Sequence, residues 1–362
     1  MASSEPLENE KKNRPKADQF RQQKLPSWQP IMTPLKVVIA FLAIGVAFVP
    51  TGVSLMKESD SIYESSIVYD SKGTTDLDCK ITTANEGKVC TATFKFDQKV
   101  TGPLYVYYEL TNFYQNHRTY VMSIDYYQLN AVTSQGTCSD KNKNGTLYLN
   151  PCGLIANSFF NDDISLTTSG YTMTETGIAW STDTLKYIQP SGFKAVSVGT
   201  STSTKTCAEA GLETTCTRNY YDSYTGNYYY YYYPKESEYQ YLYETYSQIN
   251  PVYGVQDPHF MVWMRTASLP NFRKLYGIID SHHFSSGDTL TFTIEANFEV
   301  TSFGGTKTLT VSTLSDLGGK NTYLGIAYII VGGLSLFLGV IFATKSLISP
   351  RPIGDPQFLN WH

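Results

Sequence analysis

Six cysteines carry the most predictable chemistry in this sequence, because thiols in an oxidising compartment form disulfides. All six lie between residues 79 and 216 of the 362-residue chain. Several pairings are possible, but the local clustering favours neighbours that each close a short loop. These pairs are Cys79–Cys90, Cys138–Cys152 and Cys207–Cys216. The sequence has no C-x-x-C motif, which argues against a zinc site and a thioredoxin-like redox site.

Histidines and nearby carboxylates offer a second kind of chemistry. Asp257, His259, Asp280, His282 and His283 could form an acid–base or metal cluster, but their spacing matches no ligand pattern. The phosphate-binding, nucleophile-elbow, zincin and dinucleotide-binding motifs do not occur either. We therefore expect these five residues to be structural. The chain is predicted to be no enzyme, with no catalytic residue and no metal site.

Two uncharged segments are long enough to hold the chain in a membrane. Residues 37–56 and 323–344 each reach across the ~30 Å hydrocarbon core as a helix with a rise of ~1.5 Å per residue. The alternative is a pair of buried helices in a soluble protein, where uncharged runs of this length are rare. The mean hydropathy of −0.24 argues against a polytopic membrane protein, and the net charge of −4 excludes a basic nucleic-acid-binding protein.

The charges that flank these segments predict the topology. The N-terminal tail, residues 1–36, carries seven cations against four anions, and Lys345 and Arg351 follow the second segment. The positive-inside rule places this tail and the tail of residues 345–362 in the cytoplasm. Residues 57–322 then form a lumenal or extracellular domain, which agrees with the position of all the cysteines. The sequon at Asn144 also lies there, so Asn144 is a candidate glycosylation site.

Period-two patterns in the central segment predict β-structure. Leu290, Phe292 and Ile294 alternate with threonine and glutamate, as in a strand with one buried face. A Gly-Gly pair and a second strand through Leu309 and Val311 follow, which predicts a hairpin. The expected fold is a membrane protein with two transmembrane helices and a large, mainly β ectodomain. That ectodomain is predicted to be an antiparallel β-sandwich with insertions.

Tyrosine is unusually frequent, with 29 residues in the chain and an unbroken run at residues 228–233. The surrounding stretch is mostly Tyr, Asp, Glu, Ser and Asn. We interpret residues 200–246 as a Tyr-rich surface insertion whose rings pack partly on the sandwich. An aromatic binding surface is the alternative.

Small residues form a stripe on each predicted membrane helix. Gly325, Gly332 and Gly339 recur every seven residues in the second segment. The first segment carries a comparable stripe, which comprises Ala40, Ala43, Ala47 and Thr51. Such stripes allow two helices to approach closely in lipid. The sequence leaves equally open whether they pack the two helices together or bind a membrane partner.

Several segments together resemble one protein family. In the N-terminal tail the resemblance lies in residues 14–16, 20–26 and 28–31. In the rest of the chain it lies in residues 107–121, 151–162, 177–183, 262–277 and 314–329. These segments are similar to hallmark blocks of the accessory (β) subunits of type-IV P-type ATPase phospholipid flippases, also called the ligand-effect modulator three or cell-division-control fifty family.

The resemblance implies a non-catalytic subunit that forms a heterodimer with such an ATPase in a phospholipid bilayer. The subunit would support the folding of the pump, its export from the endoplasmic reticulum and its transport cycle. The pump would move aminophospholipids to the cytoplasmic leaflet. Mg²⁺ and ATP would bind the pump, so no cofactor is expected on this chain. The complex would reside in membranes from the endoplasmic reticulum to the Golgi, endosome or plasma membrane.

The resemblance also supplies candidate contacts with the pump. They are Arg14, Lys16, Phe20, Gln23 and Trp28 in the tail, Trp263, Arg265, Arg273 and Lys274 in the ectodomain, and Gly325, Gly332 and Gly339 in the second membrane segment. The ectodomain cations either anchor the interface or brace the domain internally, and bracing is the favoured role.

Two features depart from the family pattern. Many relatives have four cysteines in the first cluster, where this chain has only Cys79 and Cys90. Residues 256–259 replace an Asn-Glu pair that often stands before the 262–277 block.

A two-span ion channel subunit with a disulfide-rich ectodomain is the alternative function. Neither membrane segment contains the ionisable residues that would suit a polar pore.

Overall fold

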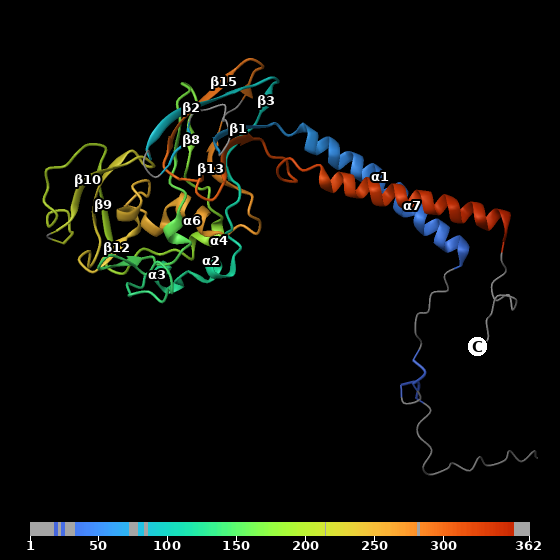
Figure 1. Cartoon of the computed structure of the whole chain (residues 1–362), viewed down its shortest axis with the longest axis horizontal. Coiled ribbons are helices and arrows are strands. Elements are labelled where there is room, and N and C mark those ends of the chain that lie inside the picture. Colours follow the sequence, from blue (N-terminus) through green and yellow to red (C-terminus); the bar gives the residue numbers. More distant parts are fainter. Residues whose placement is uncertain are drawn as a thin grey trace, which may run out of the picture. The chain divides into compact units, whose positions relative to one another are not determined.

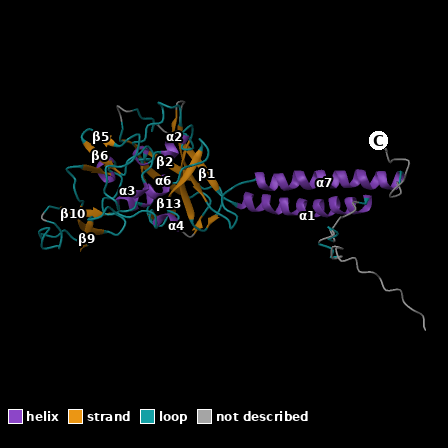
Figure 2. Cartoon of the chain, turned by 90° about the horizontal axis from the view of Figure 1, so that it is seen from below, coloured by secondary structure: helices purple, strands orange, loops and turns teal. Residues whose placement is uncertain are grey.

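The computed structural model describes residues 18–20, 23–25, 33–71, 79–82, 86–213, 215–280 and 283–350. The chain divides into two units, one of Met1–Lys57 with Thr322–His362 and the other of Glu58–Asn321. The described part of the first unit is mostly helical, whereas strands predominate in the second (Figures 1 and 2). This confirms the predicted fold class of two membrane helices and a mainly β ectodomain.

The first unit contains two long apolar helices, α1 (Pro34–Ser61) and α7 (Tyr323–Ile348). Both are long and apolar enough to cross a membrane. Each extends beyond the uncharged run that predicts it. Pro50 lies inside α1 without ending it, as membrane helices tolerate.

Glycines bring α1 and α7 into close contact. A Cβ atom on Gly52 would lie 2.7 Å from the Ile329 side chain and 2.8 Å from the carbonyl oxygen of Gly325. Gly332 and Gly339 pack on α1 in the same way, at Val49 and Leu42. Gly325, Gly332 and Gly339 therefore pack α7 against α1, which is one of the two roles that the sequence leaves open. The stripe on α1 that begins at Ala40 stays exposed.

The replacement Gly332→Leu is expected to separate α1 from α7, because a Cβ there would lie 2.8 Å from the Val49 side chain and 3.0 Å from its backbone nitrogen. Gly333→Leu is the matched control, since nothing lies within 4 Å of a Cβ at that position. Cysteines placed at Phe48 and Tyr328, whose rings are 5.0 Å apart, report on the pairing through disulfide formation. Equal cross-linking in both leucine variants would contradict this packing.

Two antiparallel sheets form the sandwich of the ectodomain. The larger has the order β1 (Glu64–Ser71), β16 (Thr306–Ser312), β4 (Leu104–Leu110), β13 (Phe272–Ile279) and β8 (Met173–Thr174). The smaller has the order β2 (Lys88–Lys95), β15 (Thr289–Ala296) and β7 (Asp163–Leu166). The main core lies between them, because residues of both sheets belong to one buried cluster. Examples are Val106, Tyr108 and Leu309 from the larger sheet and Phe94 and Phe292 from the smaller.

The strand predicted from the alternation of Leu290, Phe292 and Ile294 exists as β15, with these three side chains fully buried. The predicted hairpin between this strand and β16 is wrong, because β15 pairs with β2 and β7 while β16 pairs with β1 and β4. The physical reason lies just after β15. The Asp162 carboxylate accepts hydrogen bonds from the backbone amides of Asn297 and Phe298, so these amides are not available for strand pairing.

The Tyr-rich insertion has a small core of its own. Its sheet comprises β9 (Lys194–Gly199), β11 (Asn227–Tyr232) and β10 (Thr217–Asp222). Tyr231 and Tyr233 pack with tyrosines of a second small sheet, which comprises β12 (Tyr239–Tyr241), β6 (Leu147–Asn150) and β5 (Lys143–Asn144). These rings pack on one another, while Tyr243 and Tyr246 pack against the main core, so the predicted partial packing on the sandwich is confirmed for those two. Tyrosine hydroxyls in this region also form hydrogen bonds with the backbone. The Tyr233 hydroxyl, for example, donates to the Pro251 carbonyl oxygen at 2.8 Å.

Short helices gather at the end of the ectodomain away from β2 and β15 (Figure 1). They are α2 (Arg118–Met122), α3 (Tyr126–Leu129), α4 (Ser181–Thr184) and α6 (Pro258–Met264). The remaining short elements are α5 (Leu242–Thr245), the 3₁₀ turns at Ala156–Ser158 and Gly254–Gln256, and the paired strands β3 (Val100–Thr101) and β14 (His283–Phe284). None of these helices is long enough to be stable alone, so packing on the sandwich holds them.

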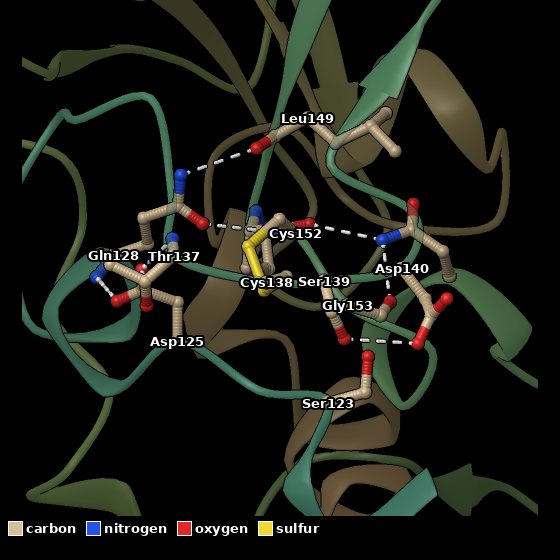
Figure 3. Close-up of a disulfide and its surroundings, with 12 residues drawn as sticks. Ser123, Asp125, Gln128, Thr137, Cys138, Ser139, Asp140, Leu149, Cys152 and Gly153 are labelled. Carbon is tan, nitrogen blue, oxygen red and sulfur yellow. Dashed lines mark hydrogen bonds between the residues drawn. A yellow bond between two sulfur atoms is a disulfide. The ribbon is translucent and has the colours of Figure 1, made fainter. Parts of the chain in front are cut away.

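The three disulfides join the neighbouring cysteines that the sequence favours. Figure 3 shows the surroundings of Cys138–Cys152. The Gln128 side-chain amide bridges this loop, because it donates to the Leu149 carbonyl and accepts from the Cys152 amide. Asp125 holds the start of α3 and the Thr137 amide. Asn144 is exposed in β5, with its side-chain nitrogen bonded to Gln240.

Candidate partner-binding surface

The strongest candidate block, residues 262–277, folds as the end of α6 and most of β13. Asp257 is the N-cap residue of α6. Its carboxylate accepts hydrogen bonds from the backbone amides of His259 and Phe260, and Pro258 occupies the first helical position. The helix ends at Met264, and the chain then crosses the surface before it returns as β13. The block therefore places some of its side chains in the core and others on the surface.

Trp263 belongs to the core. Its side chain is 0% exposed, and its indole N–H donates to the Ile155 carbonyl at 2.8 Å. The rings of Phe113 and Phe298 lie 5.6 and 6.1 Å from it. Trp263 is thus a packing residue of the ectodomain, and its surface is not available to a partner.

Lys274 is also internal, and it closes the C-terminal end of α6. Its Nζ atom donates to the carbonyl oxygens of Val262, Trp263 and Arg265 at 3.0, 2.9 and 2.6 Å. The C-terminal end of a helix has unpaired carbonyls and a partial negative charge, which both suit an ammonium group. Burial, and to a smaller extent the Arg265 guanidinium, lower the pKa of Lys274 to about 7.

Arg273 braces three strands. Its Nη1 atom lies 2.9 Å from a Glu64 carboxylate oxygen on β1 and 3.9 Å from a Glu109 oxygen on β4. The guanidinium also lies 5.2 Å from the centre of the Tyr107 ring. Arg273 and Lys274 therefore occupy the bracing role that the sequence favours for this group.

Arg265 differs from its neighbours because its side chain is 61% exposed. The guanidinium lies over the Trp180 ring at 4.8 Å, and Nη1 is 3.8 Å from a carboxylate oxygen of Asp183. Trp180 is itself 59% exposed. An open groove of about 390 Å³ lies beside this pair, between α6 and β13. Arginine and tryptophan in such a position are typical of residues that anchor a protein interface.

Further apolar side chains are exposed around this pair. We call Arg265 and the following residues the exposed belt: Tyr114, Met122, Tyr126, Tyr127, Trp180, Leu185, Ile188 and Leu269. Two hydrogen bonds join segments that neighbour its members in sequence. Asn116 bonds the Ser268 carbonyl, and the Ile188 amide bonds the Leu129 carbonyl. The belt extends over α2, α3 and α4 at the end of the ectodomain where the short helices gather (Figure 1). Exposed large apolar side chains gathered at one end of a folded domain are typical of a binding surface.

Most of the belt was not among the candidates from the sequence. Trp180 lies in a family-like block, but nothing in its sequence context distinguishes an exposed tryptophan from a buried one such as Trp263. Tyr126, Tyr127 and Leu185 follow no period of two or 3.6. Their exposure depends on how short helices pack on the sandwich, which a local pattern does not reveal.

The remaining candidates fall outside this surface. Phe20 and Gln23 are described and exposed, whereas Arg14, Lys16 and Trp28 lie outside the described residues. The described part of the chain contains no group of His, Cys, Asp and Glu side chains that could hold a metal ion. In the histidine-rich segment, Asp257 caps α6 and His283 is exposed on β14, while His282 lies outside the described residues.

His259 lines a polar cavity of about 220 Å³ between the sandwich and the Tyr-rich insertion. Its Nε2 atom lies 3.0 Å from a Glu175 oxygen, and its ring packs against Tyr276 at 4.4 Å. Burial alone would lower the pKa of His259, but the Glu175 hydrogen bond and the nearby Asp257 and Asp163 charges raise it above its ordinary value. Protonated His259 therefore stabilises the folded ectodomain.

This raised pKa predicts how stability depends on pH. The contribution of His259 is complete below about pH 6.5, its pKa in the unfolded chain, and is lost as the pH rises through the higher folded pKa. The wild-type chain should therefore exceed His259→Gln in unfolding free energy most at pH 6, with a smaller difference at pH 8.5. His283→Gln, at an exposed position, is the control. Denaturant titrations at both pH values would contradict the assignment if the difference grew with pH.

Comparisons with known proteins agree with these observations. Residues 55–352 match the family model described as LEM3 (ligand-effect modulator 3) family / CDC50 family. The chain is 35% identical to ALA-interacting subunit 3 of Arabidopsis thaliana, a match that covers 96% of this chain and 91% of the relative. It is 34% identical to cell cycle control protein 50A of Bos taurus, over 91% and 88% of the two chains. It is 29% identical to the phospholipid-transporting ATPase accessory subunit CRF1 of Saccharomyces cerevisiae, over 97% and 90%.

Proposed function

Because the chain belongs to the LEM3/CDC50 family, we propose that it is a non-catalytic accessory subunit of a phospholipid-transporting P-type ATPase. The name of the yeast relative describes that role, and the similarity extends over nearly the whole of both chains. Two membrane helices and a disulfide-bonded ectodomain suit a subunit that contacts a pump both in the bilayer and outside it. The pump would bind Mg²⁺ and ATP.

The topology proposed from the charged tails places the ectodomain in the lumen or outside the cell. The subunit would assist the folding of the pump and its export from the endoplasmic reticulum, and would then remain with it in the Golgi, endosome or plasma membrane. It would also support the transport of aminophospholipids to the cytoplasmic leaflet. A partner shifts a conformational cycle only by binding one state more tightly than another, so the interface would differ between states of the pump.

The observation that carries this proposal is the exposed pair of Arg265 and Trp180 within the exposed belt. Arg273, Lys274 and Trp263 hold the domain together, whereas Arg265 can be removed without loss of a core contact. The exposed belt would bind lumenal loops of the pump. In the first unit, the exposed stripe on α1 that begins at Ala40 would admit a close membrane helix of the pump.

Arg265→Ala and Trp180→Ala are expected to reduce the capture of the ATPase by at least about tenfold, because interface energy is concentrated in a few Arg and aromatic residues. Disulfide formation and thermal stability of the chain should not change. Arg218→Ala, at an exposed position on β10 outside the exposed belt, is the matched control. The measurement is the amount of ATPase that co-purifies with each variant in mild detergent. Full capture by both belt variants would exclude the exposed belt as the interface.

A further inference from the structure

A second group of residues is buried completely and plays no part in the proposed interface. Lys307 on β16, Asp70 on β1 and Asp162, which precedes β7, each have 0% side-chain exposure. Lys307 and Asp70 face each other across the β1–β16 pair. Asp162 comes from the segment that leads into the other sheet of the sandwich. One cation and two carboxylates are thus enclosed between the two sheets, where burial of charge is costly.

Lys307 and Asp162 form a short, buried ion pair. Nζ lies 2.7 Å from Oδ2 of Asp162, yet among the described residues it has no acceptor in hydrogen-bond alignment. Asp70 Oδ2 is 3.5 Å from the same Nζ. The Lys307 nitrogen is thus held beside the carboxyl carbon that it would attack in amide formation.

The Asp162 carboxyl group is surrounded by donors that would stabilise negative charge on its oxygens. The backbone amides of Asn297 and Phe298 both lie 2.6 Å from Oδ1. The Tyr69 hydroxyl donates to Oδ2 at 2.9 Å. Two amides directed at one carboxyl oxygen have the geometry of an oxyanion hole, which stabilises the tetrahedral intermediate of acyl transfer.

We propose that Lys307 and Asp162 condense to an intramolecular isopeptide bond. In this step the Asp70 carboxylate takes one proton from the Lys307 ammonium, and the neutral amine attacks Cγ of Asp162. The new C–N bond forms as the carbonyl electron pair moves to Oδ1, between the amides of Asn297 and Phe298. The C–Oδ2 bond then breaks, and Oδ2 leaves as water with the proton returned by Asp70 and a second proton from the nitrogen. One ammonium and one carboxylate become one amide and one water.

The surroundings favour this reaction. Condensation replaces the Lys307–Asp162 ion pair by a neutral amide that retains the Asn297 and Phe298 hydrogen bonds, and Asp70, left without its cation, takes up a proton in the product. The fixed positions replace a bimolecular encounter by a unimolecular step. Burial raises the pKa of Asp70, although the nearby Lys307 and the Ile81 amide act in the opposite direction, and a raised pKa suits a proton shuttle.

The bond would connect β16 of the larger sheet with the segment that leads into the smaller one. The three disulfides join residues that are close in sequence, with separations of 9 to 14 residues. An amide between positions 162 and 307 would instead close a long loop, and reducing agents would not break it. This inference does not depend on the proposed function.

Peptide mass mapping of the purified full-length chain tests the inference, after reduction and removal of N-linked glycan. Trypsin does not cleave after an acylated lysine, so we expect a branched peptide that contains Lys307 and Asp162. Its mass should equal that of the two linear peptides less one water. Complete cleavage after Lys307, with no branched peptide, would overturn the proposal.

Variants separate the roles of the three residues. Asp162→Asn should give the same branched product with ammonia as the leaving group, whereas Asp162→Ala and Lys307→Arg should give none. Asp70→Asn should slow formation about a hundredfold, the usual contribution of a positioned proton-transfer group. Formation at the wild-type rate in Asp70→Asn would contradict the role of Asp70. A branched peptide in Lys307→Arg would contradict the assigned linkage.

Discussion

Replacement of Trp263 by alanine is expected to lower the unfolding free energy of the ectodomain by about 3–5 kcal/mol. The side chain is fully buried, and several aromatic rings would lose their packing partner. The Ile155 carbonyl would also lose its indole donor. Denaturant unfolding of the purified chain measures the loss. A loss of this size is a large fraction of the total unfolding free energy of an ordinary domain.

The exposed Trp180 supplies the matched control. Trp180→Ala removes the same side chain from an exposed position, so its effect on stability should stay within about 0.5 kcal/mol. The pair of variants therefore separates packing from binding, since Trp263→Ala acts through the fold and Trp180→Ala through capture of the ATPase. Equal destabilisation by both would contradict the positions assigned to them.

Lys274→Met should lower the unfolding free energy by about 2–4 kcal/mol, because three carbonyl oxygens at the end of α6 lose their donor in a buried site. The methionine keeps most of the volume, so the loss measures the polar contacts. Lys235→Met, at an exposed position, is the control. Thermal or denaturant unfolding near neutral pH checks the difference.

The same variant should change the pH dependence of stability. Lys274 has a pKa of about 7 in the folded chain and about 10.4 when unfolded, so between these values the unfolded state binds more protons. The contribution of this group to stability therefore rises with pH over that window and falls as the pH drops through 7. Lys274→Met should lack this rise. An unchanged slope in the variant would show that the ammonium does not titrate there.

Local patterns were sufficient for the elements that depend on local sequence. The uncharged runs predicted α1 and α7 because a membrane helix needs only length and apolar composition. The alternation around Phe292 predicted β15, since one face of that strand is buried along its whole length.

Features that depend on contacts distant in sequence could not be predicted in this way. β16 pairs with β1 and β4, and the amides just after β15 bind Asp162, which lies more than a hundred residues earlier in the chain. The sequence predicts a Tyr-rich surface insertion, but composition does not reveal that rings such as Tyr233 form a small core of their own. Arg265 and Lys274 belong to one sequence block, and only the position of each relative to α6 distinguishes the exposed side chain from the buried one.

Affinity purification of the full-length chain in mild detergent tests the central claim most directly. Mass spectrometry would identify the co-purifying proteins, and an ATPase assay would follow on the same eluate. We expect a P-type ATPase in one-to-one stoichiometry, with turnover that phospholipid stimulates. A homo-oligomer of this chain alone, without ATPase, would contradict the assignment as an accessory subunit.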